Sequence, residues 1–307
     1  MSFHILVTGS SGFIGRHLCY ALKEFGYRIS CLDRSNILGH DRYLINLLDA
    51  KAVGELIGEL QPDFVVHLAA NKTRSFDKES FRSTYDSNVH SAWNVIDACI
   101  GLPNFRRFIF FGSCEEYGLT AVPYFESQKA EPLSPYGLSK LTITQILGAL
   151  FKSRGFRSLV LRPSIVYGPG QEEGMFIPSL IQALFNGNPY AMTKGEQLRD
   201  FIYVDDVVRG VLKAIQADED IDGNVINIAS GVSFRIKDVV DIVLEEMPKS
   251  TVNFVNLGAI PYRELEQMQY AVSAAHAQEI LGWQANTGLR DGLRKTINWV
   301  VGRDGYI

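Results

Sequence analysis

Three side chains near the middle of the sequence have the chemistry to move a proton to or from a substrate oxygen. Tyr136 and Lys140 are four residues apart in a helix predicted to begin at Ser134, so they share one face of it. A lysine ammonium beside a phenol favours the phenolate and lowers the phenol pKa. Tyr136 could then act as a general base or acid. Ser113 follows the predicted strand Phe108–Phe111 and would hold the same oxygen by a hydrogen bond.

A glycine-rich turn near the N-terminus indicates what these residues work with. The turn, T-G-S-S-G-F-I-G, follows the apolar run Phe3–Val7 and opens the amphipathic segment Phe13–Phe25. A strand, a glycine turn and a helix in this order receive a dinucleotide pyrophosphate at the helix N-terminus. Gly9 permits the tight turn, Gly12 lets the backbone approach phosphate, and Gly15 lets the helix pack closely on the strand. The predicted cofactor-binding residues of the turn are Gly9, Ser11, Gly12, Phe13, Ile14 and Gly15.

The next predicted strand points to the identity of the dinucleotide. Tyr27–Asp33 ends in a carboxylate at about the spacing expected for the ribose acceptor, roughly 20 residues after the glycines. Asp33 would accept hydrogen bonds from both ribose hydroxyls and repel a 2′-phosphate, which favours NAD(H). Arg34 beside it could bind that phosphate, so NADP(H) is the alternative.

Strands and helices alternate up to about residue 165, as in a doubly wound α/β fold. The strand Phe64–Ala70 is too uniformly apolar to have a wet face, which indicates a parallel sheet covered on both sides. We therefore predict a dinucleotide-binding domain over residues 1–165. Residues 166–307 are predicted to form a smaller α/β lobe that binds substrate, with Asn224–Ile228 a candidate to return to the main sheet.

Composition narrows the class of protein. The chain has 307 residues, of which 46% are hydrophobic and 21% charged, and its formal net charge is −4. These values suit a globular protein and argue against nucleic-acid or anionic-membrane partners. The four cysteines form no zinc spacing, so no metal site is expected. Unpaired cysteines in apolar segments, with no signal peptide or membrane-length apolar run, favour a cytoplasmic protein.

Taken together, the motifs resemble the extended short-chain dehydrogenase/reductase family, in its branch of nucleotide-sugar epimerases, dehydratases and reductases. Beside the glycine turn and Ser113, Tyr136 and Lys140, the matching segments are H-L-A-A, R-P-S-I-V-Y-G-P-G, R-D-F-I-Y-V-D-D and L-G-W. The resemblance implies a Rossmann doubly wound parallel sheet, an NAD or NADP cofactor and a C-terminal lobe for a nucleotide-diphosphate sugar. It also implies a homodimer through a four-helix interface.

The resemblance assigns further residues. It implies that Arg199, and Arg263 seven residues before Tyr270, bind the substrate diphosphate, for which the planar guanidinium is suited. Asp49 resembles the acceptor of the adenine amino group, with a helix N-cap the equal alternative. His67 resembles a structural position, and Lys72 and Arg74 are unusual for the branch. The remaining residues implied to contact the cofactor are Leu68, Ala69, Ala70, Pro163 and Ile165, together with Tyr136 and Lys140.

The reaction depends on the loop after Ser113. The resembling 4,6-dehydratases carry an Asp-Glu pair where this chain has Cys114-Glu115, and a thiol is a poor proton donor to a leaving hydroxyl. The form S-x-E-E-Y-G is closest to reductases of 4-keto-6-deoxy sugars, so reduction of an NDP-4-keto-6-deoxyhexose is the first expectation. In that reaction Glu115 would accept a substrate hydroxyl. An NAD-dependent nucleotide-sugar 4-epimerase is the alternative, followed by a dehydratase and last by a non-catalytic dinucleotide sensor.

Overall fold

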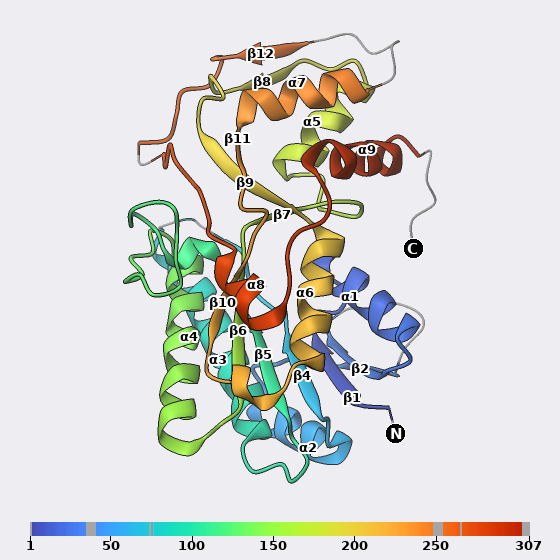
Figure 1. Ribbon diagram of the computed structural model, residues 1–307, viewed down its shortest axis with the longest axis vertical. Helices are drawn as coiled ribbons and strands as arrows, with labels where there is room; N and C mark the ends of the chain where they lie inside the picture. Colours follow the sequence, from blue (N-terminus) through green and yellow to red (C-terminus); the bar gives the residue numbers. More distant parts are fainter. Residues whose placement is uncertain are drawn as a thin grey trace.

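A computed structural model gives the arrangement of the chain (Figure 1). It describes residues 2–34, 41–73, 75, 77–247, 254–264 and 266–302. The molecule has a larger part built on a seven-stranded sheet, drawn in the lower half of Figure 1, and a smaller lobe above it. Arg74, which the sequence analysis singled out, lies outside the described residues.

The larger part is a parallel sheet whose strand order places a switch point at its centre. The order is β10-β6-β5-β4-β1-β2-β3, and all the pairings are parallel. The strands are β1 (His4–Thr8), β2 (Arg28–Asp33), β3 (Asp41–Leu44), β4 (Phe64–His67), β5 (Arg107–Phe111), β6 (Ser158–Pro163) and β10 (Val225–Ile228). Between β1 and β4 the strand order reverses direction, and ligands of such sheets bind beyond the carboxyl ends of the strands at that point.

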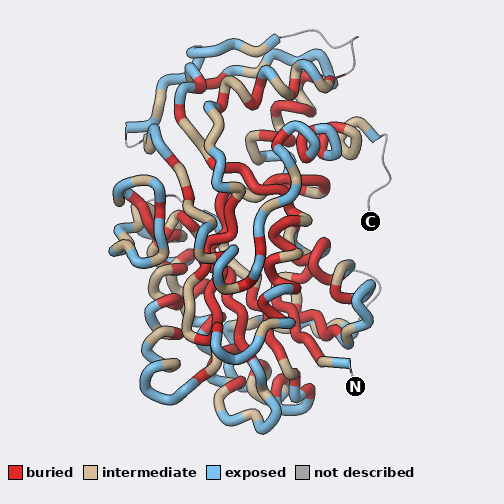
Figure 2. The backbone as a smooth tube through the Cα atoms, in the orientation of Figure 1, coloured by how far each residue is buried: buried red, intermediate tan, exposed pale blue. Residues whose placement is uncertain are grey.

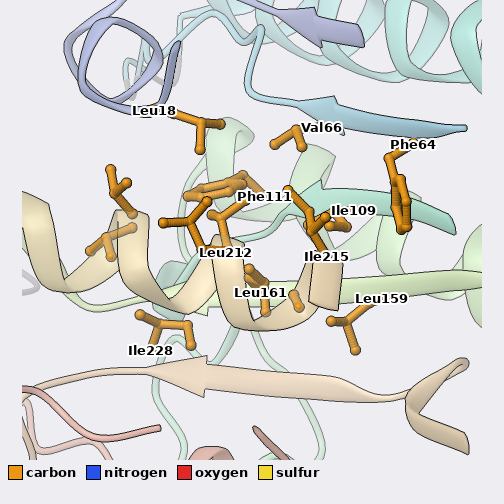
Figure 3. Close-up of a cluster of buried hydrophobic side chains, with 14 of the residues drawn as sticks. Leu18, Phe64, Val66, Ile109, Phe111, Leu159, Leu161, Leu212, Ile215 and Ile228 are labelled. Carbon is orange, nitrogen blue, oxygen red and sulfur yellow. The ribbon is translucent and has the colours of Figure 1, made fainter. Parts of the chain in front are cut away.

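Helices cover both faces of this sheet, so its inner strands are buried, whereas the edge strand β3 is partly exposed (Figure 2). One face carries α1 (Phe13–Glu24), α6 (Val204–Gln216) and α8 (Ala275–Leu281); the other carries α2 (Ala50–Leu60), α3 (Lys78–Cys99) and α4 (Pro135–Arg154). Alternate strand residues face opposite layers: Ile5 and Val7 join the first core, whereas Leu6 joins the second. Figure 3 shows Leu212 and Ile215 of α6 against the strands in the first core.

The smaller lobe has its own core. Its elements are β7 (Ile165–Tyr167), β8 (Tyr190–Met192), β9 (Leu198–Tyr203), β11 (Ser233–Arg235), β12 (Val255–Leu257), α5 (Phe176–Phe185), α7 (Ile236–Glu246) and α9 (Leu289–Val300). The strands form one sheet of order β11-β9-β7 and a parallel pair β12-β8. Two short 3₁₀ helices, η1 (Cys114–Glu116) and η2 (Glu219–Ile221), complete the assigned elements.

The predicted Rossmann-type α/β fold is confirmed, and the second half of the chain is shared between the two parts. After β9 the chain returns as α6 and β10, and β10 pairs with β6 in the register Val225 to Val160. The predicted return of Asn224–Ile228 to the main sheet is therefore correct. The boundary at residue 165 stays a prediction. The edge strand β3 was not predicted, since its segment reads as a polar loop up to Arg42. Among the described residues, no helix is long and apolar enough to cross a membrane.

Candidate functional site

The glycine turn between β1 and α1 leaves backbone donors available for an anion. Gly9 has φ +69°, which a residue with a side chain rarely adopts, and the Gly12 N–H donates to the Gly9 carbonyl over 3.1 Å. Gly12 is the N-cap of α1, and among the described residues no side chain caps this end and no acidic residue lies in the first turn. The free N–H groups and the positive dipole end of α1 are therefore open to phosphate.

Two glycines of the turn are required by close packing. A Cβ on Gly15 would lie 2.3 Å from the Gly9 carbonyl oxygen and 2.7 Å from the Ser10 Cα. The helix thus packs on the turn itself rather than on the strand, which corrects the reason first given for Gly15. A Cβ on Gly9 would lie 2.8 Å from the Ala69 backbone nitrogen, so the turn touches the segment after β4.

A cleft of about 720 Å³ lies beside this turn, in the size range of small-molecule and cofactor sites. Eight predicted cofactor residues line it: Gly9, Ser11, Gly12, Asp33, Arg34, Leu68, Ala69 and Ala70. The other eight are not among the described residues that line the cleft: Phe13, Ile14, Gly15, Asp49, Tyr136, Lys140, Pro163 and Ile165. Asp49 is the N-cap of α2, where its carboxylate accepts from the Ala52 N–H over 3.0 Å.

The carboxylate of Asp33 stands at the end of β2 and is tied to the glycine turn. Its Oδ2 accepts hydrogen bonds from the Ser11 N–H over 2.5 Å and from the Ser10 hydroxyl over 3.1 Å. Partial burial raises the pKa of Asp33, but the hydrogen bonds from Ser11, Arg34 and Ser10 outweigh it, and the net shift is downward. The group is therefore an anion that can accept hydroxyl donors.

Helix α4 carries Tyr136 and Lys140 to the carboxyl end of β5. Its N-cap is Ser134, whose side chain accepts from the Gly137 N–H over 3.0 Å. The Lys140 Nζ donates to the Phe111 carbonyl over 2.7 Å and lies 5.7 Å from the centroid of the Tyr136 ring. Burial lowers the pKa of Lys140 to about 8, although the nearby Glu116 carboxylate raises it.

Ser113 follows β5 and is brought to the same place. Its Oγ accepts from the Glu115 N–H over 3.1 Å, which leaves the hydroxyl hydrogen for donation to another group. The Ser134 hydroxyl donates to Glu115 Oε2 over 3.1 Å, and a Cβ on Gly137 would lie 2.8 Å from the Glu115 carbonyl oxygen. The Ser113 loop thus packs on the first turn of α4, and the structure brings the predicted serine, tyrosine and lysine together.

One residue at the site escaped the sequence reasoning. Asn88 of α3 is buried and lines the cleft. Its amide accepts from the Asn71 N–H over 2.7 Å and donates to the Asn71 carbonyl over 3.0 Å and the Ser139 hydroxyl over 2.9 Å. It joins the loop after β4 to α4. The sequence pattern that could have revealed Asn88 is its spacing of four and seven residues from Ala92 and Val95, which places a polar amide on the buried face of α3.

Cys114 and His67 are buried beside the site without facing the cleft. Cys114 packs among tyrosines of the core, its thiol donates to the Arg162 carbonyl over 3.3 Å, and burial raises its pKa well above the usual range. His67 contacts the Thr8 hydroxyl over 3.0 Å, and burial lowers its pKa to about 3, so the ring is neutral at pH 7. Both positions are structural in this arrangement.

The two arginines expected to bind diphosphate lie in the smaller lobe, in different surroundings. Arg199 is largely buried on β9 and donates over 2.7 Å to the carbonyls of Leu198 and Gln267, and it forms an ion pair with Glu266. Arg263 is exposed. Their role in substrate binding stays a prediction.

The fold and this geometry define a class: a dinucleotide-binding α/β protein with a serine, tyrosine and lysine set beside the cofactor cleft. The described residues contain no group of three or more histidine, cysteine or acidic side chains that could hold a metal ion. The cleft suits a dinucleotide because its glycines stand where a Cβ would intrude and its helix end offers free donors.

Comparison with known proteins gives the family. Residues 5–229 match the model of the NAD dependent epimerase/dehydratase family, and the chain belongs to that family. It is 27% identical to a UDP-glucose 4-epimerase of Rhizobium meliloti, covering 96% of each chain, and 26% identical to dTDP-glucose 4,6-dehydratase 1 of Escherichia coli, covering 99% and 94%. The structure of a Bacillus cereus UDP-glucuronic acid 4-epimerase, in complex with UDP-glucuronic acid and NAD, superposes with a TM-score of 0.87 at 26% identity, covering 97% and 99%. The protein is thus an NAD-dependent enzyme of the nucleotide-sugar epimerase/dehydratase type.

Proposed function

We propose that the protein is an NAD-dependent 4-epimerase of a nucleotide-diphosphate hexose or hexuronic acid. The observation that supports this most is the placement of Lys140, which lies 5.7 Å from the Tyr136 ring and donates to the carbonyl of Phe111, two residues before Ser113. Cys114, by contrast, is fully buried in the core. Ser113, Tyr136 and Lys140 together would supply one proton acceptor, Tyr136, for one sugar hydroxyl. Inversion at C4 needs no more than that from the side chains.

The burial of Cys114 argues against dehydration. Loss of water from the sugar needs a second acid beside Glu115 to protonate the leaving hydroxyl. The matching residue here is a thiol that is 0% exposed and whose pKa burial raises further. Likeness to a dehydratase therefore does not imply that this protein catalyses dehydration.

Each residue of the set has a separate task in the proposed reaction. Ser113 donates its hydroxyl hydrogen to the C4 oxygen and holds it in place. Tyr136 takes the proton from that oxygen and later returns it, and the Lys140 ammonium stabilises the phenolate. A bound NAD would supply the hydride acceptor and donor for C4.

The substrate's nucleotide end is assigned to the smaller lobe. Arg199 and Arg263 are proposed to bind the diphosphate, Arg199 exchanging its contact with Glu266 for phosphate oxygens. Because the compared structure was solved with a UDP-sugar, UDP is the first nucleotide to test. A homodimer through α3 and α4, which pack against each other, is part of the same proposal.

Product analysis tests the assignment. Purified protein is incubated with UDP-glucose and, separately, with UDP-glucuronic acid, and the sugar is followed by proton NMR. We expect conversion to the C4 epimer up to an equilibrium mixture, with no net consumption of added NADH. Absence of an epimer from either substrate, and from the corresponding GDP, CDP and dTDP sugars, would refute the proposal.

A 4-keto reductase is the second candidate, because Glu115 lies at the N-terminus of α4 beside Ser134 and could accept a substrate hydroxyl there. It predicts a different readout. An NDP-4-keto-6-deoxyhexose would oxidise added NADH or NADPH stoichiometrically, whereas an epimerase would not.

A further inference from the structure

Glu116 is a fully buried carboxylate directly behind the predicted catalytic serine. It is 0% exposed, and a Cβ on Gly112 would lie 2.4 Å from its Oε1. The glycine before Ser113 thus makes the space that this carboxylate occupies. A buried acid is costly unless it is paired and hydrogen-bonded, so its contacts need an explanation.

One carboxylate oxygen of Glu116 is held by two neighbouring elements. Oε2 accepts from the Arg162 Nε over 3.0 Å and Nη2 over 2.7 Å, and from the Thr144 hydroxyl over 2.9 Å. The Arg162 guanidinium in turn lies 4.7 Å from the centroid of the Tyr117 ring. Glu116 is therefore fixed between β6 and α4 by an ion pair and a hydrogen bond.

The other oxygen reaches the catalytic loop. Oε1 accepts from the Ser113 N–H over 2.9 Å, while the Ser113 Oγ accepts from the Glu115 N–H. These two bonds form a capping box around η1. The first fixes the backbone of Ser113 and the second orients its hydroxyl. Glu116 thus fixes the backbone from which the Ser113 hydroxyl projects.

Glu116 also lies next to Lys140, because its Oε2 accepts from the hydroxyl of Thr144, one turn further along α4. The charged or titratable groups facing Lys140 are Glu116 from η1, Lys72 from the loop after β4, His67 from β4 and Tyr136 from its own helix. His67 is neutral, and Lys72 opposes the positive charge. Of the three groups that come from other elements, Glu116 is the one that favours the ammonium form.

We propose that Glu116, held by Arg162, is a positioning residue of the active site that fixes Ser113 and stabilises the positive charge of Lys140. This inference rests on the proposed function, because it assigns Glu116 a task in the proton transfer there. It predicts that the charge of Glu116, and not only its volume, matters for Tyr136 and Lys140.

The test is a pH titration of Lys140 in the full-length protein, which needs no substrate. Protein labelled with ¹³C and ¹⁵N in lysine is followed by NMR at the Cε and Nζ signals, with Lys140 assigned from their loss in Lys140→Met. Glu116→Gln keeps the volume and the acceptor for Ser113 but removes the charge. We expect its Lys140 midpoint to fall by about one pH unit or more.

The matched control breaks another buried ion pair away from the site. Arg107 and Asp222 form a comparable pair at the other end of β5, with side chains 3% and 2% exposed. Asp222→Asn is expected to lower stability without moving the Lys140 midpoint. An unchanged midpoint in Glu116→Gln, or an equal shift in Asp222→Asn, would overturn the proposal.

Two further measurements keep the test decisive. If Glu116→Gln does not fold, it is combined with Arg162→Met and compared with Arg162→Met alone, so that the two proteins differ only in the Glu116 charge. The Lys140 midpoint should be lower in the double variant, and equal midpoints would overturn the proposal. Where a substrate turns over, the alkaline limit of kcat should move with the Lys140 midpoint and KM should stay within about twofold. Absence of turnover in the wild-type protein would refute the proposed function, and the titration would still decide the role of Glu116.

Discussion

At the scale of single residues, the site depends on Tyr136 being the proton acceptor. Replacing Tyr136 with Phe removes the acceptor and keeps the ring. We expect kcat to fall by about 10²- to 10⁴-fold, because that is the usual contribution of a general acid or base. NAD affinity, measured by fluorescence titration, should change little. A variant that retains kcat would remove Tyr136 from the mechanism.

His67 gives a pH prediction at the same scale. Its pKa in the folded protein is about 3, below the ordinary value of 6.5, so the unfolded chain binds the extra proton first as pH falls. Stability is therefore fully present above pH 6.5 and is lost progressively between pH 6.5 and 3. From pH 7.5 to 5.0 this amounts to about 2 kcal/mol in the free energy of unfolding.

The variant His67→Asn checks this. Urea unfolding of both proteins at the two pH values gives the change in free energy of unfolding, and the variant's change should be about 2 kcal/mol smaller. The comparison uses each protein's own pH dependence, so a uniform loss of stability in the variant does not matter. Equal acid sensitivity of the two proteins would show that His67 is not the group responsible.

Those residues of the site that belong to short local motifs could be predicted from the sequence. The glycines of the turn and the Tyr136–Lys140 spacing act over a few residues, and the structure places them as local chemistry requires. Asn88 could not be found in this way, because its partner Asn71 lies 17 residues away and meets it only after α3 has folded onto the sheet. The Arg199–Glu266 contact has the same origin.

At the scale of elements, the turn between β1 and α1 tolerates little added volume. Gly15→Ala would place its Cβ 2.3 Å from the Gly9 carbonyl oxygen, so the turn must shift. We expect a cost of about 1–3 kcal/mol in a packed site and a loss of NAD affinity of about tenfold or more.

Gly58→Ala is the control. Gly58 lies inside α2, and a Cβ there meets no described atom within 4 Å. That variant should bind NAD normally and gain up to about 1 kcal/mol in stability, because alanine favours a helix over glycine. Normal NAD binding by Gly15→Ala would show that the turn does not depend on close packing.

Long periodic elements were predictable, whereas several short ones were not. The sequence has a long helical pattern over Glu79–Cys99, and the structure shows a helix there, α3 (Lys78–Cys99), with its buried residues at helical spacing. The four-residue strand β3 forms because it pairs with β2, and no local sequence pattern predicts that pairing. The three-residue strands of the smaller lobe likewise depend on pairing partners distant in sequence.

At the scale of the whole molecule, the homodimer expected from the family resemblance predicts an apolar contact on the exposed face of α3. Trp93 is 38% exposed there. Trp93→Glu should yield a monomer of 34.3 kDa by light scattering, where the wild type has twice that mass, because a charge would be buried in the interface. Tyr20→Glu on α1, where the side chain is 51% exposed, is the control and should leave the mass unchanged. A wild-type mass equal to the monomer's would contradict the dimer.

The division of labour between the two parts follows from the path of the chain. β10 and α6 return to the large sheet after β9, so the smaller lobe is joined to the cofactor-binding part by several crossings (Figure 1). The lobe that carries Arg199 on β9 is therefore not attached to the part that carries Tyr136 by a single flexible linker. The return of Asn224–Ile228 to the sheet was predicted from the sequence, whereas its pairing with β6 joins residues far apart in the chain and could not be.

The most direct test of the account follows the hydrogen at C4. A nucleotide sugar that the protein converts is prepared with deuterium at C4, and its epimer is examined by NMR and mass spectrometry. If NAD removes and returns the same hydride while Tyr136 moves only the hydroxyl proton, the epimer keeps its deuterium at C4. An epimer that has exchanged this deuterium for solvent hydrogen would contradict the account, since inversion would then proceed through proton abstraction from carbon.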